Sequence, residues 1–229
     1  RVFGMLHMPS LPVGHFAIRP GPIMAATAEF TITVKGRGGH AAMPNGTIDP
    51  IVTASQLVGA LQTIVSRNAD PVEALVVSVT KFHAGDAYNV IPEQAEIAGT
   101  VRTLKKEVAR MAEERLRAIC AGVAAASGTT IEVRYDANYP VTFNDPQQTV
   151  FASDVAAAVA GDAQVIRAMP PVMGGEDFSY MLEARPGAFI FIGNGESAGL
   201  HHPAYDFNDE AIPHGVSYWV RIAETALAA

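Results

Sequence analysis

The sequence has a single cysteine, few basic residues and no long apolar run. One cysteine among 229 residues cannot form an internal disulfide, so core burial must stabilise the chain, and a reducing, cytoplasmic location is expected. Lys and Arg number 16 against 23 Asp and Glu, a net charge of −7, which argues against nucleic acid and anionic membrane as partners. The sequence has no apolar stretch of about 18 residues, so no membrane span is predicted. Its first residues lack the basic-then-apolar order of an export signal, so no such signal is predicted.

The apolar residues between Ala28 and Ala137 follow the order strand, helix, strand, strand, helix, strand. Alternation with period two predicts the strands, and recurrence at helical spacing predicts the helices. Asp49-Pro50 supplies an N-cap and a first-turn proline, and Gly128 suits a left-handed C-cap. This order is the ferredoxin-like, split βαβ arrangement, an antiparallel sheet covered on one face by two helices. We expect strands near 28–35, 75–82, 95–103 and 131–135 and helices near 51–65 and 105–127.

The flanking segments differ in pattern and are bounded by prolines. A helix is expected over 147–160, a short strand near Val165, a helical segment from the Gly174-Gly175 turn to Leu182, and an apolar strand over 188–192. This alternation is typical of α/β packing, although two strands are too few for such a sheet. We therefore expect three parts: a catalytic-domain segment over 1–26, an inserted domain over 27–138, and a second catalytic-domain segment over 139–229.

Histidines are the main candidates for metal binding. No His-x-x-x-His pair on a helix and no Cys-x-x-Cys occurs, so a metal site would have to combine distant loops. His7 lies near a strand end, and His201-His202 precede Pro203, which favours extended geometry in which neighbouring side chains diverge. At most one of that pair can then join a given ligand set. A catalytic zinc usually takes three protein ligands, and the pattern alone nominates two; the alternative is that these are hydrogen-bonded loop histidines.

Other residues suit substrate binding, and each also has a purely structural interpretation. His40 follows a glycine-rich turn that allows close backbone approach, and Asn89 could donate to a carbonyl or anchor its loop. Arg102, on the solvent side of a strand, could hold a carboxylate in bidentate fashion or simply be exposed. Glu176, after Gly174-Gly175, is interpreted as capping a helix N-terminus. Cys120 lies on an apolar helix stripe and is expected to be a core thiol.

Six motifs in one order give a more specific indication. The chain resembles the aminoacylase and carboxypeptidase family of dinuclear-metal amidohydrolases, most closely its hippurate hydrolase and indole-acetyl-amino-acid hydrolase branch. The resemblance covers nearly the whole chain. It is carried by GMLHMP at 4–9, GGHAAMP at 38–44 with Asp49-Pro50-Ile51, YNVIP at 88–92, GTVR at 99–102, GGEDF at 174–178, and LHHP at 200–203 with Tyr205-Asp206-Phe207.

The resemblance implies a metal-dependent hydrolase that cleaves the amide bond of N-acyl amino acids or small peptides. It implies that His7 and His201 are metal ligands, in a complete site holding two divalent ions, which are zinc, manganese, cobalt or nickel. It further implies that the inserted domain is a lid through which the protein forms a homodimer. His40 would then stabilise the oxyanion in the partner's site. Asn89 and Arg102 would bind the substrate carbonyl and carboxylate, again across the dimer.

Two departures from the family pattern qualify this expectation. Asn45 stands where many relatives have a second lid histidine. The family's metal-binding Cys/His segment and paired glutamates, one of them the general base, lie before the motif that opens this sequence. A chain that truly starts at Arg1 is therefore predicted to bind metal weakly and to have no turnover. The alternative function is a non-catalytic dimerisation or binding module.

Overall fold

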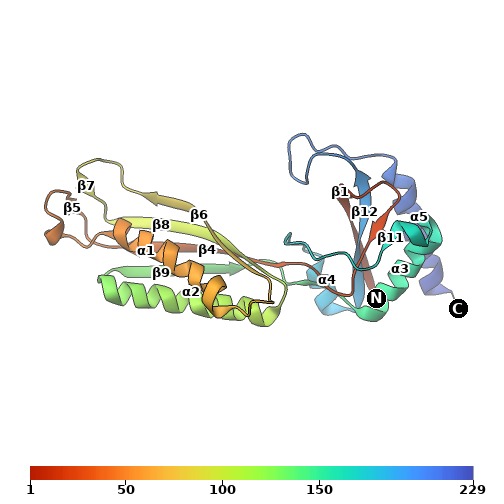
Figure 1. The fold of residues 1–229 in the computed structure, drawn as a ribbon, viewed down its shortest axis with the longest axis horizontal. Helices are drawn as coiled ribbons and strands as arrows, with labels where there is room; N and C mark the ends of the chain where they lie inside the picture. Colours follow the sequence, from red (N-terminus) through yellow and green to blue (C-terminus); the bar gives the residue numbers. More distant parts are fainter. Residues whose placement is uncertain (229) are drawn as a thin grey trace. The chain divides into compact units, whose positions relative to one another are not determined.

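A computed structural model describes residues 1–228 (Figure 1). The chain forms two compact units. The inserted domain is Ala26–Val141, and the flanking domain combines Arg1–Ala25 with the chain from Thr142 onward.

The inserted domain is built on a four-stranded antiparallel sheet with the order β6-β8-β4-β9. β4 lies between β8 and β9, with Ile32 opposite both Ile97 and Val133. Two helices pack on one face of this sheet (Figure 1), which confirms the split βαβ arrangement. The elements are β4 (Ala26–Lys35), β5 (Gly39–His40), α1 (Pro50–Thr63), β6 (Leu75–Ala84), β7 (Val90–Ile91), β8 (Gln94–Thr103), α2 (Lys106–Ser127) and β9 (Thr130–Ala137).

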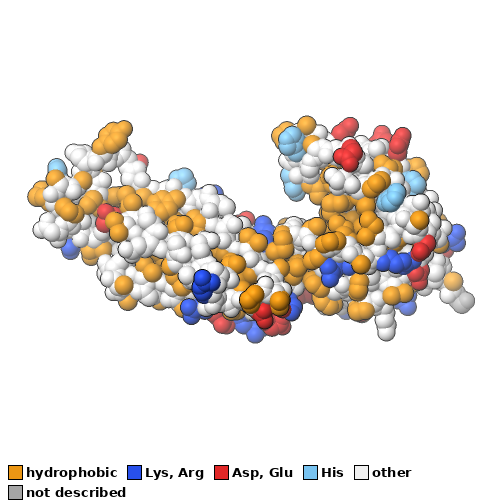
Figure 2. All heavy atoms as spheres, in the orientation of Figure 1, with side chains coloured by type: hydrophobic (Ala, Val, Ile, Leu, Met, Phe, Trp, Pro, Cys, Tyr) orange, Lys and Arg blue, Asp and Glu red, His pale blue; other side chains and the backbone are white. Residues whose placement is uncertain are grey.

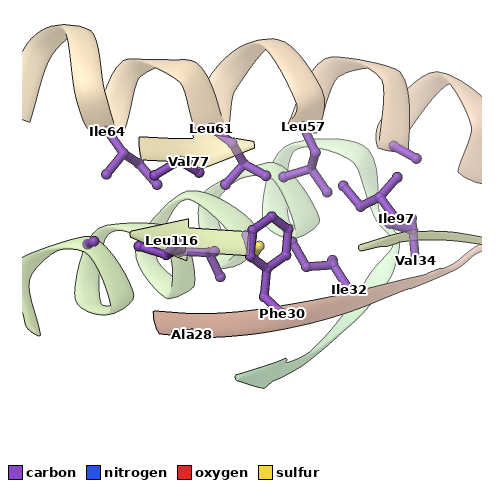
Figure 3. Close-up of a cluster of buried hydrophobic side chains, with 14 of the residues drawn as sticks. Ala28, Phe30, Ile32, Val34, Leu57, Leu61, Ile64, Val77, Ile97 and Leu116 are labelled. Atoms are coloured by element: carbon purple, nitrogen blue, oxygen red, sulfur yellow. The ribbon is translucent and has the colours of Figure 1, made fainter. Parts of the chain in front are cut away.

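Alternate residues of the strands form the core of this domain. Phe30 and Ile32 of β4 face Leu57 of α1 and Leu116 of α2, and all four side chains are buried (Figure 3). Burial of each such side chain contributes about 1.5 to 3 kcal/mol of hydrophobic free energy. Cys120 belongs to the same core, where burial raises the pKa of its thiol to about 11, as expected for an inert core thiol.

The helix ends follow their expected caps. Asp49 Oδ1 accepts the backbone N–H of Ile51 at 2.8 Å and starts α1. Gly128, with φ of 74°, ends α2 in the left-handed conformation that glycine adopts without steric cost. A short 3-10 turn, η1 (Pro44–Gly46), precedes α1, and a π-helical turn, η2 (Ile64–Asn68), continues it.

The flanking domain has a mixed four-stranded sheet with the order β1-β12-β2-β11. β12 is apolar and buried along most of its length and pairs in parallel with β1 and antiparallel with β2. The two predicted strands are present as β11 and β12, and β1 and β2 join them to complete the sheet. The elements are β1 (Val2–Pro9), β2 (Phe16–Ala17), β3 (Gly21–Met24), β10 (Thr142–Asn144), α3 (Pro146–Ala160), η3 (Asp162–Gln164), β11 (Val165–Ile166), α4 (Ser179–Ala184), β12 (Gly187–Gly195) and α5 (Ala211–Leu227).

Helices α3 and α5 pack over one face of this sheet, where Phe16, Ile190 and Tyr218 lie in one buried cluster. A second cluster, containing Phe189 and Phe191, covers the other face. Within residues 1–228, no helix is both long and apolar enough to cross a membrane.

Candidate active site

His7 lies near the carboxyl end of β1, opposite Ile192 of the parallel strand β12. Its imidazole is partly buried and contacts the ring of Phe207 edge-on, with the ring centroids 4.4 Å apart. Among the residues that the structure describes, none forms a hydrogen bond with either ring nitrogen. Burial lowers the pKa of His7, which favours the neutral imidazole, the form that ligates metals.

His201 and His202 lie in the loop between β12 and α5, and both are exposed. Figure 2 shows histidine side chains over this loop. His202 Nδ1 accepts the backbone N–H of Ala204 at 3.0 Å, so that nitrogen already has a partner. No side-chain hydrogen bond of His201 occurs within the described chain. His201 has a φ of 64°, a left-handed conformation that is uncommon for a residue with a Cβ and that concentrates at functional sites.

These histidines fit a partial metal site. Of His7, His201 and His202, the two that the resemblance nominates as ligands, His7 and His201, have no protein partner for their ring nitrogens within residues 1–228, whereas His202 has one. Over the same residues, no three His, Cys, Asp or Glu side chains gather closely enough to hold a metal ion. The donor set present is therefore of the right chemical kind for zinc or a similar ion, but it is not a complete ligand set.

His40 and Asn89 are brought together at one end of the inserted domain. A two-stranded ribbon pairs β5 with β7, placing His40 opposite Val90, and the Asn89 carbonyl accepts the N–H of Ala41 at 3.0 Å. His40 Nδ1 accepts the N–H of Ala42 at 3.1 Å. In the neutral imidazole this contact puts the proton on Nε2, so His40 presents an exposed donor.

Arg102 lies at the opposite end of the same domain. It pairs with Thr27 at the start of β4, whereas Gln94, at the other end of β8, pairs with Lys35 next to the β5–β7 ribbon (Figure 1). Eight residues of strand at about 3.3 Å each separate Arg102 from Gln94 by about 26 Å. Arg102 Nη1 is bonded to Thr100 Oγ1 and to the Val101 carbonyl, which holds the guanidinium against its own strand. The structure therefore does not bring Arg102 to His40 and Asn89 within one chain.

Glu176 has a feature that the capping interpretation does not anticipate. Its Oε1 accepts the N–H of Phe178 at 3.2 Å, and the helix that follows begins at Ser179, later than expected. Burial, together with a hydrogen bond and charge from Asp177, raises the pKa of the Glu176 carboxyl. A carboxyl with a raised pKa in a glycine-rich loop is a candidate for proton transfer or substrate contact. The sequence signals for it are the acidic pair after two glycines and the GGEDF motif at 174–178.

Comparison with known proteins identifies the family. The model of peptidase family M20/M25/M40 matches residues 1–225. N-acetylcysteine deacetylase of Bacillus subtilis (strain 168) is 39% identical over 226 residues, which are 99% of this chain and 59% of the relative. Hippurate hydrolase of Campylobacter jejuni is 38% identical over 222 residues, 97% of this chain and 58% of that enzyme.

A solved structure gives the same result. The Bacillus subtilis YXEP protein, described as a dinuclear metal-binding peptidase of the M20 family, superposes with a TM-score of 0.80 at 35% identity, covering 98% of this chain and 56% of that one. The chain therefore spans more than half, but less than two thirds, of the length of these relatives. Both the resemblance read from the motifs and the predicted fold are confirmed: this chain belongs to peptidase family M20/M25/M40.

Proposed function

We propose that the intact protein hydrolyses the amide bond of N-acyl amino acids in a metal-dependent reaction. One observation carries the proposal. His7, a partly buried imidazole with no hydrogen-bond partner within residues 1–228, lies near a strand end in contact with the loop that carries His201. The relatives named hippurate hydrolase and N-acetylcysteine deacetylase support an acylated amino acid as substrate.

In this proposal His7 and His201 are two of the ligands for a pair of divalent ions, zinc, manganese, cobalt or nickel. His202 is not a ligand in this proposal, because its Nδ1 accepts the Ala204 N–H and the neutral imidazole then carries its proton on Nε2, which leaves neither nitrogen a free lone pair. Such ions, when bound, polarise the amide carbonyl and lower the pKa of bound water. The 229-residue chain by itself is proposed to lack turnover, because no three ligating side chains gather within residues 1–228.

His40 is proposed to stabilise the oxyanion that forms when the amide carbonyl is attacked. The Ala42 N–H fixes the imidazole in the tautomer that carries a proton on Nε2, so the donor is oriented before the reaction. Removing one preorganised oxyanion donor typically lowers kcat by about 10²- to 10³-fold. Asn89, directly before the facing strand β7 of the same ribbon, is proposed to bind the same carbonyl.

We propose that the enzyme is a homodimer joined through the inserted domain, whose edge strand β6 exposes Val76 and Phe82. Arg102 and His40 lie at opposite ends of this domain, too far apart for one small substrate to contact both within a chain. They can serve the same substrate only if each site takes Arg102 and His40 from different protomers. A mixture of His40→Ala and Arg102→Ala variants should then recover about a quarter of wild-type activity, because half of the dimers are mixed and each has one intact site.

Hydrolysis assays on the intact protein test the proposal. Release of glycine from hippurate and of cysteine from N-acetylcysteine is measured with each metal and with a chelator. We expect chelation to abolish hydrolysis, and His40→Ala to lower kcat by about 10²-fold or more while exposed His83→Ala, on β6 of the same domain, leaves kcat unchanged. If the protein is a dimer but hydrolyses no N-acyl amino acid with any of these metals, the result would support the alternative function, a non-catalytic dimerisation module.

A further inference from the structure

Asn194 occupies an unusual position in the central strand of the flanking domain. Its neighbours Gly193 and Gly195 pair with Met8 and Pro9 of β1, while Asn194 itself has no Cα partner there. Such a bulge redirects a side chain at a strand end, and bulges concentrate beside active sites. The Asn194 side chain is buried, with 1% of its surface exposed, one strand away from His7.

The Asn194 amide bonds to both sides of a single residue in the loop before α5. Its Nδ2 donates to the carbonyl of Asp206 at 2.9 Å, and its Oδ1 accepts the N–H of Asn208 at 3.0 Å. These two backbone groups flank Phe207. The third contact, from Nδ2 to Ser197 Oγ at 3.2 Å, leads to the other end of the same loop. Asn194 therefore fixes the backbone on either side of Phe207 to the end of β12.

Phe207 in turn contacts His7. Its ring meets the imidazole edge-on, with a centroid separation of 4.4 Å and an interplanar angle of 79°. A metal-ligating histidine is usually oriented by a carboxylate or carbonyl that binds its second ring nitrogen. No residue between 1 and 228 makes such a bond to His7, so the packed ring is the contact that can set the orientation of this imidazole.

We propose that Asn194 is a positioning residue, which holds Phe207 against His7 and thereby fixes the imidazole for metal ligation. The part of this inference that concerns metal ligation rests on the proposed function, whereas the contacts that join Asn194, Phe207 and His7 do not depend on it. The same amide ties the loop that carries His201 to the strand end beside His7, so one buried side chain orders both proposed ligand segments.

NMR of the full 229-residue chain tests the contact without any metal. An aromatic ring at 4.4 Å from the imidazole shifts the His7 ring protons away from the positions of exposed histidines such as His83. We expect Phe207→Leu and Asn194→Ala to move these resonances to the exposed positions. Ser197→Ala, which removes only the contact remote from Phe207, should leave them in place, and Phe207→Tyr, which keeps the ring, should do so too. Unchanged His7 resonances in a folded Phe207→Leu variant would overturn the proposal, even if Asn194→Ala fails to fold.

Metal affinity of the intact protein, measured by competition with a chelator, tests the consequence. Loss of a group that orients a ligating histidine weakens metal binding by about 10- to 100-fold, and we expect this for Phe207→Leu and Asn194→Ala but not for Phe207→Tyr or Ser197→Ala. Wild-type metal affinity in Phe207→Leu would overturn the positioning role. If the wild-type protein binds no metal, the proposed function fails instead, and the NMR result then shows only that the ring contact exists.

Discussion

Replacing Asn144 by alanine should destabilise the flanking domain severely. Asn144 is fully buried, and its amide satisfies three backbone groups: Nδ2 donates to the carbonyls of Arg19 and Phe189, both at 2.9 Å, and Oδ1 accepts the N–H of Phe189 at 2.6 Å. Phe189 lies in β12, whose neighbour β2 pairs only with Phe191 and Ile192. The side chain thus takes the place of a missing strand beside the central strand of the sheet.

The magnitude follows from these three bonds. Each buried hydrogen bond contributes about 0.5 to 1.5 kcal/mol net, and each buried group left without a partner costs about 1 to 3 kcal/mol. Asn144→Ala leaves two buried groups, both of Phe189, and the partly buried Arg19 carbonyl without a partner, so we expect a loss of about 3 to 5 kcal/mol, within the upper range for single substitutions. With a urea dependence of about 2 kcal/mol per molar, the unfolding midpoint should fall by about 2 M.

Urea unfolding followed by tryptophan fluorescence measures this loss. The only tryptophan, Trp219, lies on α5 of the same domain, so the signal reports this unit. The exposed Asn45→Ala, in η1 of the other domain, is the control and should leave the midpoint unchanged. A loss below about 1 kcal/mol for Asn144→Ala would refute the reasoning, because that is the contribution of one ordinary hydrogen bond.

Three further predictions concern the two domains. Gly38→Ala would place a Cβ 2.6 Å from the Ile91 carbonyl oxygen, which displaces the β5–β7 ribbon. Hydrolysis by the intact protein should then fall by about 10²-fold. Gly46→Ala is the control, because its Cβ would have no atom within 4 Å, and it should have no effect. Leu57→Ala, in the core, should cost about 3 kcal/mol in urea unfolding, and equal loss in the exposed Val52→Ala would contradict it. Glu176→Gln should stabilise the protein at pH 7. The pKa of Glu176 is raised in the folded state, so above the ordinary pKa of 4.5 ionisation of this carboxyl disfavours folding. The gain in stability should vanish below pH 4.5, and a gain that persists there would show another cause.

The sequence predicts the inserted domain well because its signals are local. Alternation in β4, the Asp49 N-cap and the Gly128 C-cap each act within a few residues, and the structure has all three. The flanking domain is harder to predict. β2 has two residues, too few for any period to appear, and it is held in the sheet by pairing with the distant strands β11 and β12. The equally short β11 is predicted near Val165, but its partner β2 is not.

The candidate site shows the same limit. The motifs nominate the histidines, but the contact between His7 and Phe207 joins residues 200 positions apart in the chain, and the bonds from Asn194 reach 12 and 14 residues along it. No spacing rule indicates such contacts. Arg102, Asn89 and His40 all match the family motifs, yet only the strand register shows that Arg102 lies at the other end of the domain.

Metal content of the intact protein after gel filtration tests the central claim most directly. His7→Ala and His201→Ala should each lose bound metal, because each removes a ligand, while His202→Ala should keep the wild-type content, since its Nδ1 is bonded to the Ala204 N–H. Full metal content in both His7→Ala and His201→Ala, or a loss in His202→Ala as large as in His201→Ala, would contradict the account.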